Sequence, residues 1–149
     1  MKQALMIFNR NLFAAAALAI VAAPQFARAD SARQCPLQNA VLQGTYVVAG
    51  SGTINGVGPI ASLALAVYNG DGTGTLISGT QTVNGSSSAA SNLPITYTLN
   101  LDCTGSKVLG SGPSAVHMNF VISPGGSKIK WIITDPAVTM TGTGVRQDR

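Results

Sequence analysis

The chain has 149 residues, with nine Lys and Arg, five Asp, no Glu, one His and two Cys. Most hydrolytic and metal-dependent mechanisms need more imidazole and carboxylate groups than this composition offers. The formal net charge of +4 falls to +1 without residues 1–29, because three of the nine basic residues lie there and six remain against five Asp. Binding of nucleic acid requires a clustered basic face, so we expect no nucleic-acid partner.

The first 29 residues have the pattern of a secretory signal peptide. Basic residues precede an apolar stretch over 12–23, and Ala27 and Ala29 supply the small residues of a cleavage site. The stretch is shorter than the roughly 20 apolar residues that a membrane-spanning helix needs. We therefore predict a signal peptide over 1–29 and no stable membrane insertion after its cleavage. The mature chain, from Asp30, is expected to be exported, either to a periplasm or out of the cell.

Cys35 and Cys103 are the only cysteines, and both follow the predicted signal peptide. An even number of cysteines in an exported chain favours a disulfide. In the chain-entropy description such a bond would stabilise the fold by roughly 4 kcal/mol. The alternatives are two free buried thiols or a metal site. Because structural zinc sites use four ligands, two cysteines and one distant His make a poor set, and we expect no metal.

Residues 30–149 have the pattern of a single antiparallel β domain. Gly, Thr and Ser are abundant and helix formers are few, which favours short strands separated by turns. The stretch 69–72 (NGDG) predicts a tight hairpin, whereas the Ser- and Asn-rich stretch 84–92 is predicted as a loop. The predicted strands cover, in chain order, 44–50, 60–68, 73–83, 93–101, 115–123, 128–134 and 138–145.

Alternation along these strands predicts which side chains face the interior. Apolar members of each strand are expected inside and hydroxyl-bearing members outside. The predicted interior set is Leu63, Leu65, Val67, Tyr97, Leu99, Met118, Phe120, Trp131 and Ile133.

Seven or eight such strands with short connections form either a β-sandwich or an up-and-down barrel. The frequent Gly suits tightly curved strands and favours an all-β, antiparallel up-and-down barrel of about eight strands. An outer-membrane barrel is disfavoured, since the five aromatic residues after the predicted signal peptide are too few for two aromatic girdles.

Candidate catalytic groups are few. His117 is the only imidazole and is expected on the solvent side of its strand. Asp102 and Asp135 could in principle face each other as the two carboxyl groups of a glycosidase. Both are predicted at strand ends, however, where Asp commonly stabilises turns. No catalytic residue is therefore assigned.

Three segments resemble a known group of proteins. They are 44–75 (GTYVVAGSGTINGVGPIASLALAVYNGDGTGT), 97–106 (YTLNLDCTGS) and 133–147 (ITDPAVTMTGTGVRQ). Together they are similar to small exported bacterial proteins, which in turn resemble the allene oxide cyclase barrel, a relative in shape of the lipocalins. The resemblance implies a barrel with an apolar cavity, which in the cyclases holds a flexible substrate in a reactive shape without a cofactor. This chain departs from the plant enzymes, which are thought to place an acidic side chain in the cavity, because it has no Glu and no Asp on a predicted inward stripe.

The function predicted from the sequence is binding of an apolar or amphipathic small molecule inside the barrel, without catalysis and without a cofactor. The alternatives are a cofactor-independent cyclase or isomerase of the allene oxide cyclase type, and a pilin-like surface structural subunit. The same apolar residues could also form an ordinary packed core. The Tyr97 hydroxyl and the Trp131 indole are the expected polar groups of the cavity. The predicted ligand-binding residues are Leu65, Val67, Tyr97, Leu99, Met118, Phe120, Trp131 and Ile133.

Overall fold

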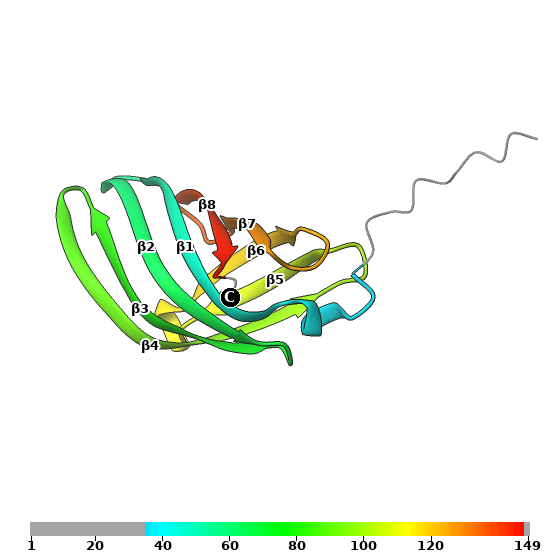
Figure 1. The fold of residues 1–149 in the computed structure, drawn as a ribbon. Coiled ribbons are helices and arrows are strands. Elements are labelled where there is room, and N and C mark those ends of the chain that lie inside the picture. The colour runs from blue at the N-terminus through cyan, green and yellow to red at the C-terminus, as the bar shows by residue number, and fades with distance from the viewer. Residues whose placement is uncertain (1–34, 148–149) are drawn as a thin grey trace, which may run out of the picture.

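The computed structural model describes residues 35–147, which form a closed eight-stranded antiparallel barrel (Figure 1). Each strand pairs with the next along the chain, and β8 pairs with β1 to close the sheet. The predicted up-and-down barrel is confirmed, whereas the predicted signal peptide, 1–29, lies outside the described residues. No helix within residues 35–147 is long and apolar enough to cross a membrane. The elements are η1 (Gln38–Val41), β1 (Gln43–Ile54), β2 (Gly58–Asn69), β3 (Thr73–Val83), β4 (Ser86–Leu99), β5 (Thr104–Leu109), η2 (Gly112–Ser114), β6 (Val116–Ile122), β7 (Lys128–Ile133) and β8 (Val138–Arg146).

The fourth strand is longer than predicted. The stretch 84–92 is not a loop, because Asn84 and Gly85 alone make the turn and β4 begins at Ser86. Both turn residues have positive φ, 45° and 85°, as in the type I′ turns that suit two-residue hairpins. The Ser-rich half of β4 pairs with β3 through its backbone, and this pairing does not require apolar side chains.

The β3–β4 hairpin extends beyond β5. β5 has six residues against 14 in β4, and its pairing with β4 covers only Ile95 to Leu99 of that strand. The first half of β4 therefore has a neighbour on the β3 side alone, and the long strands β1 to β4 form one curved wall of the barrel (Figure 1).

The inner face of β2 is opposite to the predicted one. Ala66 and Tyr68 are buried, whereas Leu63 is 58% exposed. Leu65 and Val67 share the outward face with Leu63 and are half-buried. Apolar residues occupy both faces of β2, so alternation alone does not identify the inner one. Small residues fill much of the true inner face, at Ser62, Ala64 and Ala66.

The large aromatic residues of the other strands face inward as predicted. Tyr97, Phe120 and Trp131 are 5%, 3% and 7% exposed, respectively. The ring of Trp131 packs against two glycines, Gly50 in β1 and Gly142 in β8, and a Cβ at either position would overlap it. The barrel closes here because glycine leaves room for the indole.

We expect Gly142→Ala to lower the free energy of unfolding by about 2 kcal/mol, because the added methyl group would overlap both the indole of Trp131 and the carbonyl oxygen of Ala49. Urea denaturation measures the change. Gly144→Ala in the same strand is the matched control, since its Cβ would meet only the Ile129 side chain, at 3.3 Å. Equal losses in the two variants would contradict the close packing of Trp131 against β8.

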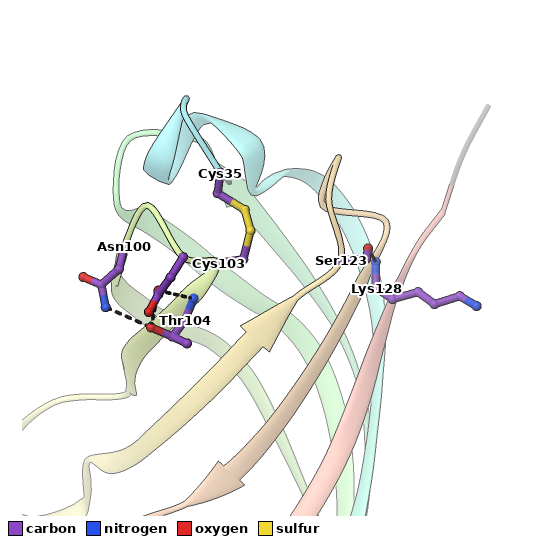
Figure 2. Close-up of a disulfide and its surroundings, with 7 residues drawn as sticks. Cys35, Asn100, Cys103, Thr104, Ser123 and Lys128 are labelled. Carbon is purple, nitrogen blue, oxygen red and sulfur yellow. Dashed lines mark hydrogen bonds between the residues drawn. A yellow bond between two sulfur atoms is a disulfide. The ribbon is translucent and has the colours of Figure 1, made fainter. Parts of the chain in front are cut away.

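The N-terminal segment closes one end of the barrel. A disulfide joins Cys35 to Cys103 in the β4–β5 loop, as predicted, with an S–S distance of 2.05 Å (Figure 2). The side chain of Asn39 in η1 accepts a hydrogen bond from the N–H of Leu99 (2.8 Å), and Leu42 is fully buried. These contacts seat the segment over the end of β4.

Arg146 attaches the end of β8 to the same closed end. Its guanidinium donates to the carbonyl oxygen of Val41 (2.8 Å) and to the hydroxyl of Tyr46 (2.9 Å). The Tyr46 hydroxyl in turn donates to the carbonyl oxygen of Gly126 in the β6–β7 turn. Side-chain hydrogen bonds thus connect the N-terminal segment, the β6–β7 turn and the last strand.

Candidate functional site

A cavity of about 570 Å³ lies in the barrel, toward the end opposite the disulfide. Its volume is within the usual range of small-molecule sites, roughly 300–1,000 Å³. Exposed residues of the β3–β4 hairpin and the β5–β6 loop contribute to its lining, among them Ala90 and Ser114. Because β5 ends at Leu109 while β4 continues past it, the cavity opens between these two segments.

A layer of three tyrosines separates the cavity from the closed end. The rings of Tyr46 and Tyr68 pack edge to face with centroids 5.2 Å apart, and those of Tyr68 and Tyr97 with centroids 5.5 Å apart. Of the three, only Tyr68 borders the cavity. Tyr68 therefore forms part of the cavity floor.

The Tyr97 hydroxyl does not point into the cavity, contrary to the prediction. It donates to the carbonyl oxygen of Leu42 (2.9 Å) and accepts from the N–H of Gly70 (3.1 Å). Both partners belong to the closed end of the barrel. The hydroxyl attaches the N-terminal segment to the β2–β3 turn, and its position leaves it no part in a ligand site within the cavity.

The floor contains a buried lysine that the sequence pattern did not reveal. Lys107 lies on the inner face of β5, borders the cavity and is 6% exposed. Its Nζ donates to the hydroxyl of Tyr68 (3.1 Å) and lies 5.6 Å from the ring centroid of Trp131. Burial lowers the pKa of Lys107 to about 8 and raises that of Tyr68. At neutral pH the pair is therefore an ammonium beside a protonated phenol.

Trp131 adds a further polar group to this region. Its ring borders the cavity, and its Nε1 is buried without a hydrogen-bond partner among the described residues. The indole N–H, which was predicted as a polar group of the cavity, therefore has no hydrogen-bond partner within residues 35–147.

A second polar pair lies near the mouth. The Nδ1 of His117 is 2.7 Å from a carboxylate oxygen of Asp135, and the backbone N–H of His117 donates to the other oxygen (2.8 Å). These hydrogen bonds, the backbone one first, lower the pKa of Asp135. The His117 side chain is 56% exposed, in agreement with its predicted solvent side.

Asp102 and Asp135 do not face each other. Successive connections of an up-and-down barrel lie at opposite ends, so the β4–β5 loop with Asp102 is at the closed end and the β7–β8 loop with Asp135 is at the open end. Asp102 accepts hydrogen bonds from the N–H and hydroxyl of Thr104 (3.0 and 2.6 Å). The carboxyl pair of a glycosidase is therefore not formed.

The eight residues predicted to bind a ligand fall into three groups. Met118, Trp131 and Ile133 border the cavity. Tyr97, Leu99 and Phe120 are buried away from it, and Leu65 and Val67 lie on the outer face of β2. Tyr68 and Lys107 border the cavity and were not predicted. Tyr68 could have been found from the alternation that leads from Ile60 along β2, whereas Lys107 lies in β5, a strand that was not predicted.

No protein-family model, curated protein or solved structure matches the chain. Within residues 35–147 there is also no group of three or more His, Cys, Asp or Glu side chains that could hold a metal ion. Function is therefore inferred from the cavity and its lining residues.

Proposed function

We propose that this chain is an exported protein that binds an apolar or amphipathic small molecule inside its barrel. The single observation that carries the proposal is the open cavity of about 570 Å³. Concave sites with apolar walls and a few polar groups are the usual form of small-molecule sites. The apolar part of the wall includes Val48, Ile60, Leu76, Leu109, Val116 and Met140.

Small inward side chains keep the interior open. An eight-stranded barrel is just wide enough for ordinary side chains to fill it. Here the inner faces of β2, β3 and β4 carry mostly residues too small to do so where the strands pass the cavity, and Gln81 in β3 is the larger exception. The small residues are Ser62, Ala64, Gly79, Ser88 and Ala90.

Three observations support the exported and small-molecule parts of this proposal. The disulfide is typical of oxidising compartments, and the signal-peptide pattern over 1–29 agrees with export. The resemblance to the allene oxide cyclase barrel supports a cavity of this kind, and membership in that group is part of the proposal. Cyclisation is not part of the proposal. Asp135 is the acidic residue that borders the cavity within residues 35–147, and it is already hydrogen-bonded to His117.

Fluorescence of Trp131 provides the test, since it is the only Trp in the chain and borders the cavity. Titration of the mature protein with decan-1-ol, a neutral apolar chain, should give a saturable change in emission with one site per chain. Ala64→Phe fills the cavity from β2 and should abolish the response. Ala61→Phe, on the exposed face of the same strand, should leave it intact. A missing wild-type response, or an equal response in Ala64→Phe, would contradict the proposal.

A further inference from the structure

The polar groups at the cavity floor have more hydrogen-bond donors than acceptors among the described residues. The Tyr68 oxygen accepts from Lys107 Nζ (3.1 Å), and its own proton remains to be donated because burial raises the phenol pKa. Lys107 has two further N–H groups, and the nearby Trp131 indole N–H is buried without a partner. Buried polar groups in folded proteins are almost always hydrogen-bonded, and exceptions call for a missing ion, water or ligand.

Lys107 is also a buried cation, and no carboxylate within residues 35–147 pairs with it. The residues that face it are Tyr97 and Met118 on the adjacent strands and Tyr68 and Trp131 across the interior, and none of these is acidic. The carboxylate that borders the cavity within residues 35–147, Asp135, is hydrogen-bonded to His117 and lies at the open end. A buried charge is costly unless it is paired and hydrogen-bonded, and none of the described residues that face Lys107 supplies a negative charge.

We propose that Lys107 and Tyr68 form a head-group site for a carboxylate, and that the ligand is an apolar carboxylic acid. This inference rests on the proposed function and names its ligand class. One carboxylate oxygen would accept from Lys107 Nζ, and the Tyr68 hydroxyl would donate to the same group. The hydrocarbon chain would extend from this floor toward the mouth, along Met118 and Val116.

The arrangement favours an anion over a neutral head group. Charge-assisted hydrogen bonds are roughly twice as strong as neutral ones, and an ion pair formed in an apolar cavity is screened little by salt. An alcohol could accept a hydrogen bond from Lys107 but would leave its charge unpaired. The same cavity should therefore bind an apolar acid more tightly than the alcohol of equal chain length.

The test compares decanoate with decan-1-ol at pH 7, with Trp131 emission or calorimetry as the readout. The wild type should bind decanoate at least tenfold more tightly than decan-1-ol. Lys107→Met, similar in length but uncharged, should lose that preference and still bind decan-1-ol. Tyr68→Phe should reduce the preference several-fold. Lys130→Met, on the exposed face of β7, is the matched control and should change neither affinity.

The two proposals fail in different ways. If neither compound binds the wild type, the proposed function is wrong and the carboxylate site with it. If both bind with equal affinity, or if folded Lys107→Met keeps the preference for decanoate, the head-group assignment alone is overturned. Circular dichroism of each variant confirms folding, and retained decan-1-ol binding shows that the cavity is intact.

Discussion

Replacement of Cys35 and Cys103 together by Ser is expected to lower the free energy of unfolding by about 4 kcal/mol. The bond joins residues 68 positions apart, so it removes a large amount of conformational freedom from the unfolded chain. It also holds the N-terminal segment, and with it the fully buried Leu42, over the closed end. Urea denaturation of the oxidised wild type and the double variant measures the difference.

The reduced wild type serves as a control, since it lacks the bond without a change of side chain. It should lose nearly as much stability as the double Ser variant. A loss below about 1 kcal/mol in both would show that strain or residual structure cancels the entropic gain. That result would contradict the role assigned to this disulfide in closing the barrel.

Lys107→Met is expected to make the protein more stable, by about 3 kcal/mol at pH 7. Burial lowers the pKa of Lys107 from 10.5 to about 8, and each pKa unit corresponds to about 1.4 kcal/mol. Replacement of a buried charge by an apolar residue of similar volume commonly stabilises a protein by this order of magnitude, roughly 1–4 kcal/mol. A chain that keeps such a residue sacrifices stability for another property, which here is the proposed capture of an anion.

The sign of the pH dependence follows from the same shift. Well below pH 8 Lys107 is protonated in both states, so the full cost of the buried charge is present. Between pH 8 and 10.5 the unfolded chain binds more protons than the folded one, so wild-type stability rises with pH. The advantage of Lys107→Met should therefore fall to about half or less by pH 9.5. Tyr68, whose pKa is raised by burial, opposes this trend only above about pH 10.

Urea denaturation at pH 7, 8.5 and 9.5 measures this advantage, with Lys130→Met as the control for removal of a surface charge. The control should differ from the wild type by less than about 0.5 kcal/mol at each pH. A Lys107→Met variant that is less stable than the wild type at pH 7 would show that the ammonium is satisfied within the barrel.

The inner face of a strand could be predicted where polar and apolar residues alternate along most of its length. Val121 and Ile132 are apolar residues on the outer face, yet the alternation along the rest of β6 and β7 correctly placed Phe120 and Trp131 inside. On β2 the same rule failed because both faces are apolar. The larger side chains, such as Leu63, were assigned to the interior, whereas the structure places small ones there.

The first half of β4 was missed for a different reason. Its side chains are the small ones of Ser and Ala on both faces, so no alternation of large apolar residues exists to be recognised. The pairing with β3 depends instead on the turn at Asn84 and Gly85 and on backbone hydrogen bonds. The Asn-Gly sequence itself is a strong hairpin signal, and it would have extended the predicted strand 93–101 back to Ser86.

The candidate site was the least predictable part of the molecule. A cavity depends on how much volume is left unfilled after several strands come together, and no single strand contains that information. Lys107 was not assigned to the interior because no strand was predicted over residues 104–109, where the structure places β5. Places where a local rule fails without an evident gain in stability are often functional, and the buried ammonium at the floor is such a place.

The most direct test of the cationic cavity is a crystal structure of the mature protein with 10-bromodecanoate, located by the anomalous signal of its bromine. We expect the carboxylate within about 3 Å of Lys107 Nζ, beside the Tyr68 hydroxyl. The bromine should lie toward the mouth, between the first half of β4 and the β5–β6 loop. An interior filled by side chains, or a ligand bound only on the outer face of the barrel, would contradict the account.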